Sequence, residues 1–559
     1  DGAGDGDGDD DEEVHRWNLR KCSAQGLDAL SEMYGDHLLP ILLPIVEVRV
    51  QNAKWQLRET AILALGAVSQ GCADGLRPHL AQIVDLMLPL VGDPRPLVRS
   101  IASWALSRYG QEVMAAANST EGQGRVEKVA VALRGALVDR NRKVQAAACG
   151  ALATYVEDAS APAFSHLLPL LLQATVQANQ VYGKKNLRHL YDLVAAIVKR
   201  AGAAGLLRTE HAAAVLQPLV ARLQALENHD LSLLPLAHCL AAVVVPFGEL
   251  GGEHTELLMH RGAQMAMEQL GQQQMEKQGS KGAAYNSEYV IASLDMMSGV
   301  VEAVGKRVEP LLGPLQVCDF VLHWGRDENA GVRQSAFAML GELAKCCPQS
   351  MLQGRATVET WAQLVLQSID LAALRGGARS AFSAANNACW AFGELSCHLD
   401  QGALEGVCAQ LVEKMAPLLN QSRGYGQSLL ENSAIAIGRL ARVCPAPLAP
   451  HLQHFVWDWC TALCYLRDDV EKEHAFAGLC KLLRLNPSAG LGAFAVLCES
   501  LGSWRQLTPG LATETMTLLA EYKAHLQQSG QWEAFLSHVR PVVRTKLSAQ
   551  FLQSTGQQL

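Results

Sequence analysis

The sequence predicts an all-α fold, a solenoid of about a dozen stacked helix pairs. Three observations lead to this prediction. Of the 559 residues, 49% are hydrophobic but only 6% are aromatic, so the apolar side chains are mostly small or aliphatic. Apolar residues recur with the spacing of an amphipathic helix. One short frame of residues also recurs along the chain, which is the sequence signature of stacked structural units.

The recurring frame starts with Asp or Asn, and continues with Val or Leu at +5, Ala at +9 and Leu at +13. The four copies are Asn52/Leu57/Ala61/Leu65, Asp93/Val98/Ala102/Leu106, Asp139/Val144/Ala148/Leu152 and Asp327/Val332/Ala336/Leu340. The first three copies start 41 and 46 residues apart, which is the period of HEAT or armadillo repeats. The frame therefore predicts a HEAT-repeat, right-handed superhelical solenoid, also called an α-α superhelix.

Each position of the frame has a structural reason. We expect the starting Asp or Asn to cap a helix, because its side chain can accept a hydrogen bond from a free backbone N–H. Val, Ala and Leu lie four residues apart and form one apolar stripe, which each repeat buries against its neighbours. Pieces of the frame recur at Leu19/Ser23/Leu27, Gly341-Glu342, Gly393-Glu394 and Gly438-Arg439.

We predict two parts of the chain: a disordered acidic loop at residues 1–16 and the solenoid at residues 17–559. The head carries eight acids and no base before Arg16, and it cannot bury apolar area. Segments near 118–125 and 271–284 are rich in Gln, Gly and Lys and are predicted loop insertions. Because the chain opens at Asp1 within an acidic run, we interpret it as a fragment or a trimmed chain.

Charge and composition exclude several function classes. The net charge is −8, and the eight acids of the head account for it, since the other 47 acids balance the 47 Lys and Arg residues. The chain after the acidic head has no net charge, which argues against nucleic-acid binding. No uncharged apolar run of roughly 18 residues or more occurs, so we expect no membrane span. We identify no signal peptide at the start of the chain.

Catalysis and metal binding are not expected either. The 15 cysteines are scattered and form no CxxC pair, which is typical of small buried side chains in a reducing compartment. Phosphate-binding GxxxxGK[ST], HExxH and GxSxG motifs are absent, and His451 and His454 have no third ligand nearby. We therefore predict no catalytic residues, no cofactor and no metal.

Trp104 lies two residues after the frame residue Ala102, which is about 200° around the helix from the apolar stripe. Trp390 and Leu63 occupy the same position in other copies, as do Gln25, Gly150 and Ile435. We expect this row to lie outside the close-packed contacts and to line an inner binding surface, because aromatic anchors with polar rims build such surfaces. The alternative is that each tryptophan fills a groove between helices.

Six segments of the chain resemble transportins, the karyopherin-β2 class of nuclear import receptors in the importin-β superfamily. They are WNLRKCSA (17–24), LVRSIASWALSRY (97–109), NLRHLYD (186–192), VRQSAFAMLGEL (332–343), NNACWAFGE (386–394) and LLENSAIAIGRLARVCP (429–445). The resemblance runs in order from Trp17 to about Phe551. The acidic head resembles the end of the family's acidic loop, and we expect the family's N-terminal arch, its main platform for the GTPase Ran, to lie outside this sequence.

The resemblance implies binding of basic nuclear localisation signals that end in Pro-Tyr, release coupled to Ran, contact with nucleoporins, and shuttling between cytoplasm and nucleus. It implies two subsites. The residues of the first are Asp28, Leu63, Ile101, Trp104 and Arg108 for the Pro-Tyr end, with Glu157 and Asp192 for an upstream arginine. The residues of the second are Asp295, Glu302, Phe382, Asn386, Trp390 and Asn432.

Four positions depart from the family pattern. Gln25 stands where the family has a small residue, and Phe382 stands where it has an aliphatic one. Gly331 stands where an acid is expected, and Glu342 keeps the negative charge on a longer side chain. The rival interpretation is a general HEAT-repeat scaffold, such as a phosphatase regulatory subunit. Binding to a basic Pro-Tyr peptide distinguishes the two.

Overall fold

The computed structural model describes residues 19–279, 284–352, 357–377, 379–420 and 424–556. The described residues form helices and turns and no strand, which confirms the all-α prediction. The predicted acidic loop at residues 1–16 and the start of the predicted solenoid at Trp17 lie outside the described residues. The described residues divide into two compact units, with the division after Gly251.

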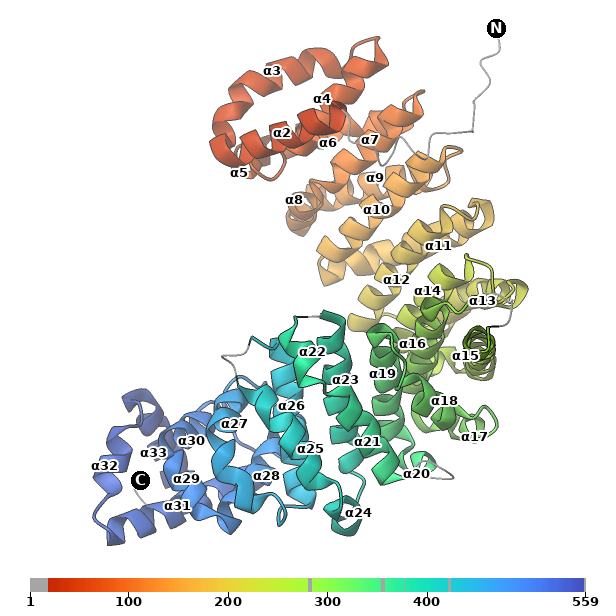
Figure 1. Cartoon of the computed structure of the whole chain (residues 1–559). Coiled ribbons are helices and arrows are strands. Elements are labelled where there is room, and N and C mark those ends of the chain that lie inside the picture. The colour runs from red at the N-terminus through yellow and green to blue at the C-terminus, as the bar shows by residue number, and fades with distance from the viewer. Residues whose placement is uncertain (1–18, 280–283, 353–356, 378, 421–423, 557–559) are drawn as a thin grey trace. The chain divides into compact units, whose positions relative to one another are not determined.

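The first unit is a stack of helix pairs in which each first helix is followed by a second helix (Figure 1). Its first helices are α3 (Leu39–Val50), α6 (Leu80–Met87), α9 (Thr120–Leu137), α11 (Ala161–Val181) and α13 (Thr209–Ala225). Its second helices are α2 (Leu19–Tyr34), α4 (Trp55–Ala67), α7 (Pro96–Ser107), α10 (Arg142–Asp158), α12 (Leu187–Ala203) and α14 (Leu233–Phe247). Consecutive second helices pack against each other and form one layer.

The second unit repeats this arrangement. Its first helices are α15 (Thr255–Lys277), α18 (Val317–Trp324), α21 (Val358–Ser368), α25 (Cys408–Met415), α27 (Val456–Leu463), α30 (Phe494–Gly502) and α33 (Pro541–Thr555). Its second helices are α16 (Ser287–Val304), α19 (Ala330–Cys346), α23 (Arg379–Ser396), α26 (Gln427–Val443), α28 (Val470–Leu485) and α31 (Pro509–Gln528). These second helices also pack in chain order, which confirms the predicted stacking of helix pairs.

The frame residues form the core of each stack. Val98, Ala102 and Leu106 are fully buried, and so are Val332 and its partners in the fourth copy. The apolar stripe predicted from the four-residue spacing is therefore confirmed. Burial of such stripes between neighbouring repeats is the main source of stability in a solenoid.

The aspartate at the start of the frame does not cap the helix, contrary to the prediction. Asp93 lies before the N-cap Arg95 of α7, and its Oδ1 accepts the Arg95 N–H at 2.8 Å. Arg58 of the preceding second helix donates to both carboxylate oxygens of Asp93, at 2.8 and 3.1 Å. Arg99 makes the same bidentate contact with Asp139. The aspartates thus tie one repeat to the next through charge-assisted hydrogen bonds.

The structure contradicts the predicted loop insertion at 118–125 and the first part of the one at 271–284. Residues 118–125 contain a short turn and then the first turns of α9, where the Ser119 side chain accepts the Gly122 N–H as an N-cap. In the segment 271–284, α15 continues to Lys277, Gln278 and Gly279 form a turn, and residues 280–283 lie outside the described residues. Glutamine and lysine are good helix formers, so a polar run without apolar periodicity was not a reliable loop signal here.

One segment, Leu233–Lys277, is long and apolar enough to cross a membrane by length and composition, with a mean hydropathy of 1.8 in its most apolar window. The expectation from sequence was that no such segment exists. The structure divides it, because α14 ends at Phe247 and a 3-10 turn at Gly248–His254 precedes α15. The 15 residues of α14 are fewer than the roughly 20 that a membrane-spanning helix needs. The longer α15 carries Arg261 and Glu268.

Candidate functional site

Trp104 lies on α7 with its ring seated on the neighbouring second helix, α4. A Cβ atom built on Gly66 of α4 would lie 2.4 Å from Cζ3 of Trp104, far inside van der Waals contact. Glycine therefore provides the space that one edge of the indole occupies. The tryptophan is half-buried, whereas Ala102 in the stripe is fully buried. This contrast fits the prediction that the Trp104 side chain points away from the apolar stripe. The expectation that Trp104 lies outside the close-packed contacts is wrong, because its ring packs on Gly66.

Three further residues of the first subsite surround this contact. Ile101 precedes Trp104 by three residues and Leu63 precedes Gly66 by three, so each side chain lies beside the contact on its own helix. Both are half-buried. Arg108 follows Trp104 by four residues and its Nε donates to the Gly66 carbonyl at 3.4 Å. The result is an apolar surface with a guanidinium group at its edge.

The acids of the first subsite lie on other second helices of the same unit. Asp28 is half-buried on α2, and Glu157 and Asp192 are exposed on α10 and α12, which pack together. Among the described residues, neither Glu157 nor Asp192 forms an ion pair. Asp158, next to Glu157, has a raised pKa because of its partial burial and the charges of Glu157 and Glu112. Glu157, Asp158 and Asp192 make the part of the layer formed by α10 and α12 acidic and suited to a cationic ligand.

Trp390 of α23 repeats the arrangement of Trp104 in the second unit. A Cβ atom built on Gly341 of α19 would lie 1.9 Å from Cζ3 of Trp390. Trp390 is half-buried as well. Lys345 of α19 lies near the ring, with its Nζ 5.9 Å from the ring centroid. This distance is within the range of a cation–π contact.

Amide side chains form the polar rim beside Trp390. Asn432 of α26 donates to Oδ1 of Asn386 at 2.9 Å, which links two consecutive second helices. Asn386 donates in turn to Asn387, whose Nδ2 donates to the Gln334 carbonyl of α19. This chain of amides fixes the orientation of the two predicted site residues Asn386 and Asn432.

Phe382 extends the same face of α23 toward its N-terminus. Its ring contacts that of Tyr425, with centroids 6.1 Å apart and an interplanar angle of 54°. Phe382 is half-buried, so part of the ring remains open. Aromatic pairs of this tilted kind contribute about 0.5–1.5 kcal/mol beyond the buried area.

Charged groups line the second helices of this unit from α16 to α28. Asp295 is half-buried and Glu302 exposed on α16, seven residues apart and on one face. Glu342 of α19 pairs with Lys345 at 3.2 Å. The sequence did not indicate the two ion pairs of Arg439. This residue is buried on α26 and donates to Glu394 at 2.8 Å and to Glu471 of α28 at 3.2 Å.

Several site residues were missed, although signals for some of them exist. Asp158 directly follows Glu157, and Lys345 follows Glu342 by three residues, the spacing of neighbours on a helix. Glu471 lies in a different repeat from Arg439, and no local spacing indicates that pair. Ile435, which the frame places in the outward row with Trp390, is buried.

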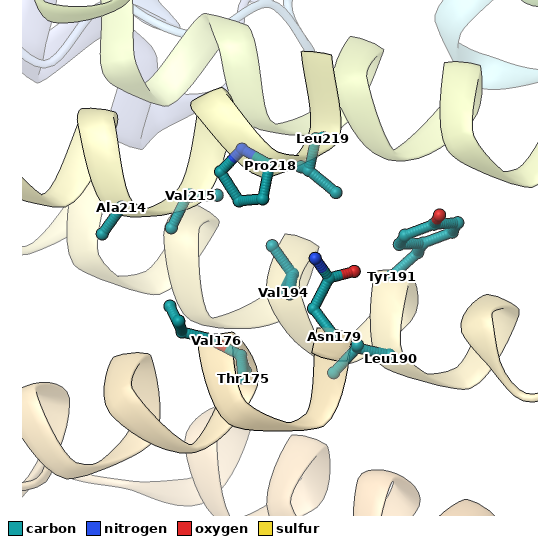
Figure 2. Close-up of a pocket in the computed structure, with 10 residues that line it drawn as sticks. All are labelled: Thr175, Val176, Asn179, Leu190, Tyr191, Val194, Ala214, Val215, Pro218 and Leu219. Carbon is teal, nitrogen blue, oxygen red and sulfur yellow. The ribbon is translucent and has the colours of Figure 1, made fainter. Parts of the chain in front are cut away.

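The cavity in Figure 2 lies between α11, α12 and α13 and is too small for a ligand. It is lined by residues such as Thr175, Leu190 and Pro218, and its volume is about 20 Å³, room for about one water molecule. The candidate site is therefore the open surface of the second helices rather than this cavity. An open surface suits an extended chain better than a compact small molecule.

Comparisons with known proteins agree with this architecture. Residues 55–109, which include α4 and α7, match the family model described as a HEAT-like repeat. Transportin-1 of Oryza sativa subsp. japonica is 37% identical over 96% of this chain and 59% of its own length. Transportin-1 of Homo sapiens is 31% identical over 96% of this chain and 58% of its own length. The chain thus spans less than two thirds of the length of these relatives.

Solved structures show the same fold. The crystal structure of Kap121p aligns with a TM-score of 0.62 and 17% identity over 99% of this chain and 56% of that one. Kap121p bound to RanGTP aligns with a TM-score of 0.58 and 17% identity over 99% of this chain and 56% of that one. The chain therefore aligns with transportins along 96% of its length and has the helical-solenoid fold of these karyopherin structures.

Proposed function

We propose that this chain is the signal-binding part of a nuclear import receptor, which holds basic, extended localisation signals ending in Pro-Tyr on its layer of second helices. The observation that carries the proposal is the repeated placement of a half-buried tryptophan on a glycine of the preceding second helix, at Trp104 and at Trp390. The Arg108 guanidinium lies beside Trp104, and the amides of Asn386 and Asn432 lie on the same side as Trp390. Such aromatic anchors with a polar rim are typical of binding surfaces.

The two subsites would take different parts of one signal. Leu63, Ile101 and Trp104 offer apolar faces for the proline and tyrosine rings. Glu157 and Asp192, exposed and without ion pairs among the described residues, would hold an upstream arginine through charge-assisted hydrogen bonds. Trp390, Phe382, Asn386 and Asn432, together with Asp295 and Glu302, would take the N-terminal segment of the signal.

The relatives support a proposal about partners and location. The relatives are named as transportins, and the Kap121p structure with RanGTP shows that a solenoid of this fold binds that GTPase. We propose Ran and nucleoporins as partners of the whole protein, and shuttling between cytoplasm and nucleus as its location. The names of the relatives favour this function over a phosphatase regulatory subunit.

The test is a titration of the purified chain with a labelled basic Pro-Tyr peptide. Trp104→Ala should weaken binding by about 2–4 kcal/mol, as removal of an aromatic anchor does, and Trp390→Ala should weaken it less if the peptide lacks an N-terminal segment. Trp457→Ala is the matched control, because Trp457 lies on the first helix α27 and is 55% exposed. Failure of the wild-type chain to bind the peptide would contradict the proposal.

A further inference from the structure

Lys345 is held beside the aromatic anchor of the second subsite by groups of its own chain. Its Nζ lies 3.2 and 3.5 Å from the two carboxylate oxygens of Glu342, three residues earlier on α19. The same Nζ lies 5.9 Å from the centroid of the Trp390 ring on α23. The side chain remains 43% exposed, so it lies at the surface of the subsite rather than in the core.

Three carboxylates from three consecutive second helices act on this one ammonium group. Burial lowers the pKa of Lys345, but the charges of Glu342, Glu394 and Glu302 outweigh burial and raise it. Burial raises the pKa of Glu342, Lys345 lowers it, and Glu302 and Glu394 raise it further. The convergence of these groups shows that α16, α19 and α23 create a place where a cation is stabilised.

The contacts of Lys345 are those that a basic ligand would need. A cationic side chain gains from an aromatic face and from a carboxylate, and Trp390 and Glu342 supply one of each. Glu394 is also engaged, because it pairs with Arg439. Among the described residues, Glu302 forms no ion pair, so it is the acid of this group that is left for a ligand.

We propose that Lys345 is an intramolecular competitor at the second subsite: its ammonium group occupies the position between Trp390 and Glu342 that a cationic side chain of the ligand would take. Basic N-terminal segments must displace it, whereas apolar segments can pack on Trp390 and Phe382 without doing so. Lys345 therefore shifts the preference of this subsite toward apolar segments. This inference rests on the proposed function of the chain.

The experiment compares two labelled peptides with the same Pro-Tyr end. One peptide has an N-terminal segment of arginine and lysine, and the other has leucine and methionine in the same places. Binding of each is measured by fluorescence anisotropy with the wild-type chain and with Lys345→Met, Lys345→Arg and Lys414→Met. Lys414 is an exposed residue of the first helix α25, so its variant removes the same charge away from the subsite.

Lys345→Met should bind the basic peptide roughly threefold to tenfold tighter, since it removes a cation–π contact and an ion pair that compete. Its affinity for the apolar peptide should change by less than about twofold, or 0.4 kcal/mol. Lys345→Arg keeps the cation and should bind both peptides much as the wild-type chain does, and so should Lys414→Met.

Two results would overturn the inference and leave the proposed function intact. One is unchanged or weaker binding of the basic peptide by Lys345→Met while the wild-type chain binds both peptides. The other is equal tightening for both peptides, because competition for a cation position must be selective. If the wild-type chain binds neither peptide, the proposed function itself fails and the inference with it.

Discussion

Trp390 rests on Gly341 so closely that a single methyl group on the glycine would lie 1.9 Å from the indole. Trp104 and Gly66 repeat this relationship in the other unit, at 2.4 Å. In both cases the glycine lies five residues after the frame alanine of its own helix, which is Ala61 or Ala336. The tryptophan lies two residues after the frame alanine of the next second helix. The glycine therefore leaves the space into which the tryptophan of the next second helix packs, and this packing holds the aromatic ring at the surface.

Gly66→Ala should destabilise the chain by about 1–3 kcal/mol, because the added methyl group overlaps the Trp104 ring and the ring or the helix must move. Peptide binding through Trp104 should weaken in parallel. The matched control is Gly150→Ala: Gly150 is exposed in α10 with no atom near a built Cβ, so alanine should stabilise the helix by about 0.5–1 kcal/mol. Urea unfolding measures both changes, and equal stability of the two variants would contradict the close packing of Trp104.

Arg439→Met should destabilise the second unit by about 3 kcal/mol or more, because it leaves the Glu394 and Glu471 carboxylates without their cation. The Arg439 side chain is only 4% exposed and joins both acids, so water cannot fully replace it. Arg484→Met is the control, since Arg484 pairs with Glu514 at the surface and should cost less than about 1 kcal/mol. Thermal unfolding that shifts equally in both variants would show that the Arg439 pairs contribute little.

Glu157→Gln with Asp192→Asn should reduce the salt dependence of binding to a basic Pro-Tyr peptide, while stability stays nearly unchanged because both side chains are exposed. Salt screens such exposed charges over about 10 Å at 0.1 M ionic strength. A control pair, Asp85→Asn with Glu127→Gln, removes the same charge from exposed positions of the first helices α6 and α9. Equal salt slopes for the two double variants would remove Glu157 and Asp192 from the proposed site.

His323 should make stability depend on pH. Burial lowers its pKa below the ordinary 6.5, and the charge of Lys277 lowers it further. Because the folded pKa is lower than the unfolded pKa, the neutral ring favours the folded state, and this contribution is lost as the pH falls below 6.5. Between pH 7 and 5, the unfolding temperature of the wild-type chain should therefore fall more than that of His323→Gln. Parallel pH profiles would show that His323 is not the source.

Sequence periodicity predicted the helix stack because burial of an apolar stripe determines it. Val98, Ala102 and Leu106 are buried as their spacing requires. The aspartate that starts the frame was wrongly predicted to cap a helix. The partner of Asp93 is Arg58 in the preceding repeat, and a contact between repeats has no local sequence signature. The loop near 118–125 was misassigned because its polar composition is typical of a loop, whereas the Ser119 side chain caps α9 at this place.

The sequence predicted the direction of the candidate site's side chains but not how they pack against neighbouring helices. Helical geometry placed Trp104 and Trp390 away from the stripe, and both are half-buried. The same rule placed Ile435 there, yet Ile435 is buried, because neighbouring second helices determine how much of the row stays open. Lys345 was overlooked for a related reason, as its contact with Trp390 crosses from α19 to α23.

The most direct test of the account is a double-mutant cycle between Trp104 and the tyrosine of a basic Pro-Tyr peptide. Affinities are measured for the wild-type chain and Trp104→Ala, each with the original peptide and with a peptide that has alanine in place of the tyrosine. We expect a coupling energy of about 1 kcal/mol or more, because the proposed site would bring the two rings into contact. Losses that add to within about 0.3 kcal/mol would contradict it, because they would show that Trp104 and the tyrosine do not meet.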